Sequence, residues 1–236
     1  MSRNMNNWIN RNILRYIDKN LFKLYKENGI HSSVFLLDLV EIGKNNSFFR
    51  HAIIGETPQM HGRDYFLINQ TINKQIIIGD ENVFREFTTL HAPSDSITKV
   101  GSRNIFMSYS HIPHDAEIGD ANKFANSVQL GGFVKILNNC YFGLGSVVKQ
   151  KIVIGSHVVI GMGSSVSINI PPFSVVIGNP GTITDINARG LRNLGLSNDE
   201  IRILKLHILG SSKFENPKID NPIVLDHWNS FRSKLN

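Results

Sequence analysis

The chain has 236 residues, of which 41% are hydrophobic and 19% charged, and its formal net charge is +6. This length suits one domain, or one domain with an appendage, and allows a substantial buried core. The positive balance favours anionic partners, but no run of Lys and Arg resembles a nucleic-acid-binding arm, so we expect no nucleic acid. The sequence shows no signal-peptide pattern and no apolar run of membrane-spanning length, which predicts a cytoplasmic protein without stable membrane insertion.

Residues 1–30 predict a helical N-terminal cap. Asn28-Gly29 is a plausible helix stop. We expect this helix to cover the open end of a repeat fold, because the terminal units of such a fold expose their core. A basic amphipathic helix could instead lie on a membrane surface. The apolar residues at helical spacing are Trp8, Ile9, Ile13, Leu14, Ile17, Leu21, Phe22 and Leu24.

An aliphatic residue or a phenylalanine recurs at every sixth position from Val100 to Val166. This period fits neither an amphipathic helix nor a half-buried strand. It is typical of a solenoid of short strands, in which one side chain per repeat points into a narrow core and three strands form a triangular coil of about 18 residues. The pattern predicts a mainly β protein, a parallel β-helix over 31–184. Its residues are Val100, Phe106, Ile112, Ile118, Phe124, Leu130, Ile136, Phe142, Val148, Ile154, Ile160 and Val166.

The same phase starts earlier in the chain and is interrupted twice. The segment from Glu56 to Asn73 contains proline, glycine and several polar residues, and we interpret it as a loop that leaves the coil. The step from Leu90 to Val100 is six plus four residues, so Ala92 to Asp95 predicts a bulging loop. Pro171-Pro172 should end the sheet, because proline lacks the donor of a ladder hydrogen bond. The earlier in-phase residues are Ile42, Phe48, Ile54, Ile78, Phe84 and Leu90.

Residues 185–236 predict a helical C-terminal extension that packs against the solenoid wall. Ser197 and Glu200 are spaced as a capping box, which marks the start of a helix. An apolar stripe follows, and a second short helix is expected near the C-terminus. The stripe consists of Ile201, Leu204, Ile208 and Leu209, and the second helix carries Trp228, Phe231 and Leu235.

The segment Ser110-His111-Ile112-Pro113-His114-Asp115 carries the strongest chemical signal. Ile112 is an inward residue, so the two histidines flank a buried position. A histidine beside an aspartate can act as a general base, because the carboxylate fixes the tautomer and stabilises the imidazolium. Two surface histidines on a turn would look the same. Metal ligation is disfavoured, because the other histidines lack ligand spacing, and we expect no metal.

Coil arithmetic adds a second group to this candidate site. Adding one coil of about 18 residues to His114 gives Gly132, and a second coil gives Gln150. The three residues should therefore stack in one column. A glycine leaves its backbone N–H open to stabilise an oxyanion, so a base and such a donor one coil apart indicate acyl transfer.

The motifs that extend this signal resemble a known enzyme family. They are IGDENVFREFTTLH, ITKVGSRNIFMSYSHIPHDAEIGD, LGGFVKI, VIGMGSSVSINIPPFSVVIGNP and INARGL, across residues 78–210. They are similar to those of the acyl-carrier-protein-dependent UDP-N-acetylglucosamine O-acyltransferases of lipid A synthesis. The resemblance implies a left-handed β-helix, a homotrimer with active sites between solenoids, and no cofactor besides the acyl thioester.

The same resemblance assigns roles by position. His114 corresponds to the general base, Asp115 to its orienting carboxylate and Gly132 to the oxyanion donor. Three further positions correspond to substrate contacts: His111, His91 and Asn187.

Several positions depart from the family pattern. Phe133 and Lys149 stand where the family has histidines, and Arg189 replaces a glutamate. Asn193-Leu194 replace the family's basic pair, to which the resemblance assigns the nucleotide phosphates. Met162 occupies the position that measures acyl length, where a bulky residue implies a short chain. The acyl-transfer groups are kept, while the acceptor pocket differs. We include Lys149, Gln150, Met162 and Arg189 among the candidate substrate-binding residues.

We therefore expect an acyltransferase that moves a short acyl group from an acyl carrier protein or coenzyme A thioester to a hydroxyl or amine of a sugar nucleotide, in lipid A or surface polysaccharide synthesis. A UDP-N-acetylglucosamine 3-O-acyltransferase proper is one alternative, with nucleotide contacts rebuilt from Lys149 and Arg189. A non-catalytic solenoid that binds a sugar nucleotide is another. A zinc solenoid would need a third histidine from a neighbouring chain.

Overall fold

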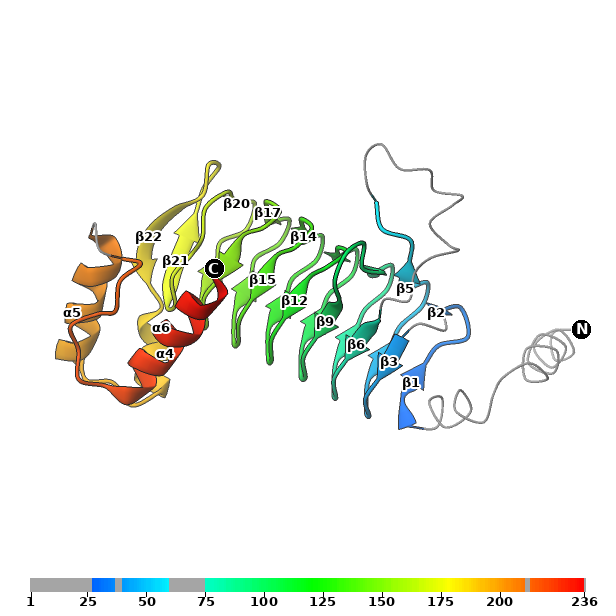
Figure 1. Ribbon diagram of the computed structural model, residues 1–236, viewed down its shortest axis with the longest axis horizontal. Coiled ribbons are helices and arrows are strands. Elements are labelled where there is room, and N and C mark those ends of the chain that lie inside the picture. Colours follow the sequence, from blue (N-terminus) through cyan, green and yellow to red (C-terminus); the bar gives the residue numbers. More distant parts are fainter. Residues whose placement is uncertain (1–26, 37–39, 60–74, 211–212, 236) are drawn as a thin grey trace, which may run out of the picture.

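The computed structural model describes residues 27–36, 40–59, 75–210 and 213–235, and the predicted N-terminal helix lies outside these ranges. Short strands wind along one axis into an elongated solenoid, and helices gather at its C-terminal end (Figure 1). Within the described part of the chain, none of the helices combines the length and the apolar character that crossing a membrane requires.

Three sheets, parallel except for the last strand of sheet A, form the sides of the solenoid, and the chain visits them in the order A, B, C. Consecutive coils pair at a step of 18 residues, as in Ile105↔Lys123 and Lys123↔Tyr141. Sheet A holds β1(Gly29–Ile30), β4(Ser47–Phe48), β7(Val83–Phe84), β10(Ile105–Phe106), β13(Lys123–Phe124), β16(Tyr141–Phe142), β19(Val159–Ile160), β21(Ser174–Ile177) and β22(Thr182–Ile186). Sheet B holds β2(Phe35–Leu36), β5(Ile53–Glu56), β8(Thr89–His91), β11(His111–Ile112), β14(Gln129–Leu130), β17(Val147–Val148) and β20(Ser165–Val166). Sheet C holds β3(Val40–Ile42), β6(Ile76–Ile78), β9(Thr98–Val100), β12(Glu117–Ile118), β15(Lys135–Ile136) and β18(Val153–Ile154).

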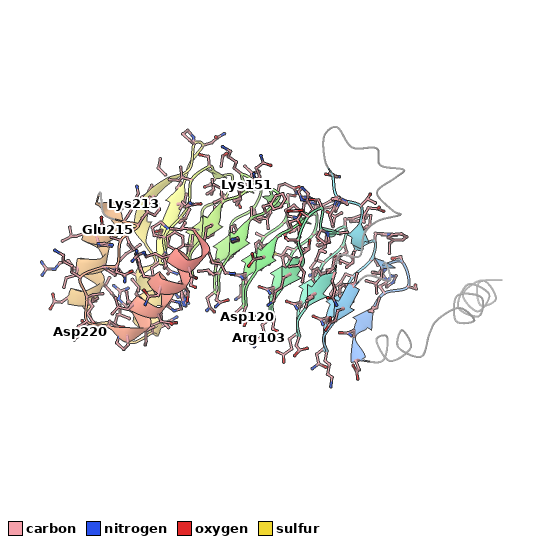
Figure 2. The ribbon with its side chains drawn as sticks, in the orientation of Figure 1. Arg103, Asp120, Lys151, Lys213, Glu215 and Asp220 are labelled. Atoms are coloured by element: carbon pink, nitrogen blue, oxygen red, sulfur yellow. The ribbon has the colours of Figure 1, made fainter. Side chains whose placement is uncertain are left out.

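The turns between the sheets form three corners that run along the solenoid. We call them the A/B, B/C and C/A corners after the sheets they join. Ser127 lies on the A/B corner, Phe133 on the B/C corner and Asn139 on the C/A corner, each with a positive φ near 60°. Arg103 and Asp120 both project from the C/A corner (Figure 2).

The residues of the six-residue period fill the core, as predicted. Each of them between Val100 and Val166 is buried. Because the coils repeat in register, like side chains lie above one another, and five phenylalanines of sheet A stack with ring centroids 4.7–5.0 Å apart. They are Phe48, Phe84, Phe106, Phe124 and Phe142.

Both predicted interruptions are visible in the strand pairing. Ile42 pairs with Ile78, a step of 36 residues (78 − 42), so the segment between β5 and β6 adds no coil. Residues 60–74 of the predicted loop lie outside the described ranges. Ile78 pairs with Val100, a step of 22 residues (100 − 78), which is four more than one coil. The second interruption is therefore a four-residue insertion in the segment between β8 and β9, where the bulging loop was predicted.

The predicted end of the sheet at Pro171-Pro172 is wrong for sheet A. Ile170 makes an isolated bridge to Ile154 on sheet C, but the chain then adds β21 beside β19 and β22 antiparallel to β21. The prolines precede the strand, where no ladder donor is required of them, so they do not block its pairing.

The C-terminal extension contains α4(Ala188–Asn193), α5(Asn198–Leu209) and α6(Pro222–Lys234). Ser197 and Glu200 form the predicted capping box at the start of α5. Ile201, Leu204 and Ile208 are buried as predicted, but Leu209 is 46% exposed and does not belong to the stripe. A second core lies around Phe173, Leu191, Leu204, Val224 and Trp228 and joins the helices to the end of the solenoid.

A buried ladder of asparagines supports the C/A corner. The Asn104 side chain accepts the Asn122 N–H at 2.9 Å and donates to Gly119 O at 2.9 Å and to Asn82 Oδ1 at 3.0 Å. The Asn104→Ala substitution removes these bonds and leaves buried backbone groups without partners, so we expect unfolding to become easier by about 2–4 kcal/mol. Chemical denaturation measures this loss. The exposed Asn126 is the control: Asn126→Ala should change stability by less than about 0.5 kcal/mol, and equal losses would contradict the ladder's role.

Candidate functional site

The B/C corner brings the predicted base and the predicted oxyanion donor together. His111 pairs with Gln129, and Gln129 pairs with Val147, so His114, Gly132 and Gln150 follow one another at one-coil steps. A Cβ added to Gly132 would lie 2.6 Å from His114 Cε1 and 2.8 Å from Nε2. The imidazole therefore lies directly against the α-carbon of Gly132, where only a glycine leaves room for it.

The backbone of Gly132 has one free group beside this ring. Its carbonyl accepts the Lys151 N–H at 2.9 Å, and the next residue, Phe133, donates its N–H to His114 O at 3.2 Å. Among the described residues, no acceptor pairs with the Gly132 N–H. A donor of this kind next to a base can stabilise negative charge that develops on a reacting oxygen.

His114 is oriented by a fully buried carboxylate. Its Nδ1 lies 2.8 Å from Asp115 Oδ2, and the Asp115 side chain is 0% exposed. Since an ionised carboxylate only accepts, Nδ1 carries the proton and Nε2 presents a lone pair. Burial would raise the pKa of Asp115, but hydrogen bonds from Ser94, Ser96, Asp95 and His114 outweigh it and hold that pKa well below its usual range. Asp115 is therefore ionised at neutral pH.

Two further predicted residues, His91 and His111, lie next to the dyad formed by His114 and Asp115. The rings of His91 and His111 meet edge to face at 4.9 Å, and His111 Nδ1 lies 2.8 Å from Thr89 Oγ1. Burial lowers the pKa of His111 to about 4, with smaller contributions from the nearby His91 and His114. Burial is also the main cause that lowers the pKa of His91. Both rings are neutral at pH 7 and can act there as hydrogen-bonding groups. The buried Nδ1 of His91 has no partner among the described residues.

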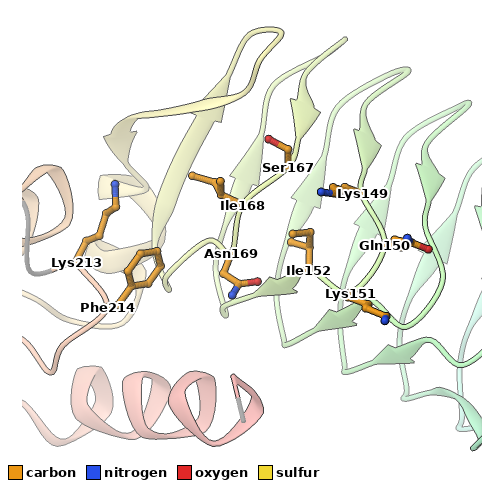
Figure 3. Close-up of a pocket in the computed structure, with 9 residues that line it drawn as sticks. All are labelled: Lys149, Gln150, Lys151, Ile152, Ser167, Ile168, Asn169, Lys213 and Phe214. Atoms are coloured by element: carbon orange, nitrogen blue, oxygen red, sulfur yellow. The ribbon is translucent and has the colours of Figure 1, made fainter.

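A basic groove of about 750 Å³ continues along the B/C corner towards the C-terminal extension (Figure 3). The Phe133 ring connects it to the dyad, because its centroid lies 5.2 Å from that of His114 and Lys151 Nζ lies 5.9 Å above it. Lys151 belongs to the solenoid and Lys213 to the C-terminal extension (Figure 2). The groove is lined by Lys149, Gln150, Lys151, Ile152, Ser167, Ile168, Asn169, Lys213 and Phe214, with no acidic side chain among these.

Three other predicted residues do not join His114 within one chain. Met162 follows β19 on the A/B corner and is 75% exposed. Asn187 caps α4 by accepting the Gly190 N–H, and it donates to the carbonyl of His157 on the C/A corner at 2.9 Å. Arg189 is exposed on α4. Sheets B and C separate these corners from the B/C corner.

The residues that hold Asp115 were not predicted from sequence. Ser94, Asp95 and Ser96 lie in the segment between β8 and β9 that carries the four-residue insertion, and their N–H groups point at the carboxylate. The insertion itself was a usable signal, since successive N–H groups in a turn can form an anion-binding concavity. Lys151 and Lys213 of the groove were also missed. In the described part of the chain, no set of three His, Cys, Asp or Glu side chains is arranged to hold a metal ion.

Comparisons with known proteins identify relatives of this chain. No protein-family model matches the chain. It is 38% identical over 170 residues to the acyl-[acyl-carrier-protein]–UDP-N-acetylglucosamine O-acyltransferase of Aliarcobacter butzleri, covering 70% of this chain and 62% of that protein. The Leptothrix cholodnii protein of the same name is 36% identical over 164 residues, covering 68% and 60%. The chain thus spans about three fifths of the length of these relatives.

A solved structure shows that the similarity extends to the fold. The UDP-N-acetylglucosamine acyltransferase of Arabidopsis superposes with a TM-score of 0.71 at 26% identity, covering 89% of this chain and 85% of that one. The predicted resemblance is therefore confirmed: this chain is a left-handed parallel β-helix related in sequence and fold to the acyl-[acyl-carrier-protein]–UDP-N-acetylglucosamine O-acyltransferases.

Proposed function

We propose that this protein is an acyltransferase that moves an acyl group from a thioester to a hydroxyl or amine of a sugar nucleotide. The observation that carries the proposal is the contact between the His114 imidazole and Gly132, with Asp115 behind the ring. A base, its orienting carboxylate and an open amide at one place form the minimal set for acyl transfer.

In this mechanism His114 Nε2 removes the proton of the acceptor hydroxyl or amine as that atom attacks the thioester carbonyl. The carbonyl oxygen becomes an oxyanion, which accepts a hydrogen bond from the Gly132 N–H. Asp115 stabilises the imidazolium through Nδ1–H. When the tetrahedral intermediate collapses, the carbon–sulfur bond breaks and the imidazolium returns the proton to the thiolate. His114 ends neutral and ready for another cycle.

The basic groove supports a thioester donor that carries phosphate. Lys149, Lys151 and Lys213 line it, and the described residues that line it include no acidic side chain. Acyl carrier protein and coenzyme A both present a phosphopantetheine arm, so either donor fits this chemistry. The curated relatives bear names that specify acyl carrier protein. We propose a carrier-protein or coenzyme A thioester as the sole co-substrate, without a metal or redox cofactor.

The acceptor is proposed to be a sugar nucleotide of lipid A or surface polysaccharide synthesis. UDP-N-acetylglucosamine is the acceptor in the names of the relatives, and 3-O-acylation of that sugar is the first alternative. Phe133 packs against His114 where the resembling enzymes have a polar ring, so the wall beside the base is apolar. This difference favours another sugar, either a hydroxyl or an amine acceptor. Met162 favours a short acyl chain.

The distribution of candidate residues over three corners supports a homotrimer. His114, Met162 and Asn187 can contribute to one site only if neighbouring copies place different corners side by side. We propose that the site lies between solenoids and that each copy supplies a different set of contacts. A cytoplasmic location remains a prediction.

Mass spectrometry of reaction products tests the proposed function. The purified chain is incubated with acyl-carrier-protein and coenzyme A thioesters of varied length and with a panel of sugar nucleotides that includes UDP-N-acetylglucosamine. We expect a nucleotide sugar heavier by one short acyl group, and release of an equal amount of free thiol. Binding of a sugar nucleotide without any acyl product across the panel would favour the non-catalytic alternative.

A further inference from the structure

The carboxylate of Asp115 is shared among more donors than a simple dyad needs. Oδ1 accepts the N–H groups of Asp95 at 3.0 Å and Ser96 at 2.7 Å, and the Ser96 hydroxyl at 3.2 Å. Oδ2 accepts the Ser94 N–H at 2.9 Å and the Ser94 hydroxyl at 2.6 Å, in addition to His114 Nδ1 at 2.8 Å. The two serine hydroxyls thus bind opposite oxygens of one carboxylate, and only that of Ser94 uses the oxygen that faces the imidazole.

The Ser94 hydroxyl also lies close to the ring itself. Its Oγ is 3.3 Å from His114 Nδ1, while its proton is given to Asp115 Oδ2. A short hydrogen bond from a neutral donor draws negative charge towards itself. Oδ2 then has less negative charge to offer to an imidazolium. Asp115 still orients His114, but it stabilises the protonated ring less than a carboxylate without this donor would.

We propose that Ser94 is a positioning residue that sets the basicity of His114 by competing with it for one oxygen of Asp115. The inference rests on the proposed function, in which His114 is the general base. A general base works best with a pKa near the working pH, since a base that is already protonated cannot take a proton. A buried aspartate without competing donors would hold the imidazolium more strongly. The Ser94 hydroxyl moderates that effect.

Other charged and titratable groups near His114 are unchanged by a substitution at Ser94. His111 on β11 and His91 on β8 face it and are neutral at pH 7, and Glu56 on β5 interacts with His91. Lys151 approaches from the following coils, above the Phe133 ring. The exposed carboxylate of Asp95 lies in the loop itself. A change in titration that occurs in Ser94→Ala but not in the matched Ser96→Ala is therefore attributed to the Ser94 hydroxyl.

Matched serine variants test this proposal. Ser94→Ala removes the hydroxyl on Oδ2, Ser96→Ala removes the hydroxyl on Oδ1, and Ser94→Thr restores a donor at the first position. The pKa of His114 is measured by NMR on protein with labelled histidines, and its signal is assigned by its loss in His114→Gln. This titration requires no turnover, so it remains informative even if acyl transfer is not detected. The acid limb of kcat/KM is measured in parallel wherever activity is present.

We expect the His114 pKa to rise by about 0.5–1 unit in Ser94→Ala, to stay within about 0.2 unit in Ser96→Ala, and to return in Ser94→Thr. The acid limb of kcat/KM should move with it. Equal shifts in both alanine variants, no shift, or a fall in Ser94→Ala would overturn the proposal and leave the loop a purely structural role. If Ser94→Ala does not fold, Ser94→Cys takes its place, because a thiol is a weaker donor of similar shape.

Discussion

Replacing His114 with alanine is expected to lower kcat by about 10²–10⁴-fold, because the variant lacks the group that takes the acceptor proton. The ring is 13% exposed and is held by Asp115 against Gly132, and the alanine variant has no group there that can accept a proton. The measurement is the steady-state rate with the donor and acceptor identified by mass spectrometry. KM should change less than kcat, since the imidazole acts mainly in the transition state.

The control for this substitution is a histidine away from the site. His207 lies on α5 and contacts Trp228, with ring centroids 5.8 Å apart. His207→Gln should retain activity within about threefold and leave the solenoid intact. A His114→Ala protein that folds normally and turns over at the wild-type rate would refute the catalytic assignment. The fold, which does not depend on this residue, would stand.

Substituting Gly132 with alanine is expected to lower kcat by about 10²-fold or more. The new Cβ would lie 2.6 Å from His114 Cε1 and 2.8 Å from Nε2, and Cβ atoms in proteins do not approach other heavy atoms so closely. Either the imidazole or the backbone must move, and both movements separate the base from the oxyanion donor. Gly132 is thus required by the close approach of the ring, and the expected loss is one of geometry.

A double-substitution cycle separates this clash from a general defect. Gly132→Ala should destabilise the protein by about 1–3 kcal/mol when His114 is present, because the side chains overlap. In a His114→Ala background the overlap is gone, so the added cost should fall below about 0.5 kcal/mol. Thermal or denaturant unfolding of the four proteins gives these values. A cost that is the same in both backgrounds, or a fully active Gly132→Ala enzyme, would contradict the contact described here.

The winding of the solenoid and the stacking of His114 on Gly132 could be predicted from the sequence. A side chain that points inward once in six residues specifies its own register, because a slip of one residue would expose Phe124 or Ile136 and turn Lys123 or Lys135 towards the core. Coil arithmetic therefore predicted the stacking of His114, Gly132 and Gln150, which the strand pairing reproduces. The bulging loop was predicted in the same way, from the ten-residue step before Val100.

Where periodicity was lost, prediction became less reliable. Leu209 continues the apolar spacing of α5 but is exposed, because the helix ends there and the second core lies nearer Leu204 and Trp228. The paired prolines suggested an end to every sheet, yet β21 extends sheet A beyond them. Both errors concern elements whose neighbours are distant in sequence, and no repeat constrains them.

Six-residue spacing by itself determined how the backbone coils, which side chains are buried and which residue lies one coil from the base, since these follow from local geometry repeated many times. Only the tertiary structure decided that Ser94 and Ser96 enclose Asp115, that Phe133 lies beside His114 with Lys151 above its ring, and that Asn187 caps α4 and bonds to the C/A corner. The reason is physical. A hydrogen bond or ring contact between non-repeating side chains depends on where an irregular loop or corner places them, and no local pattern specifies that placement.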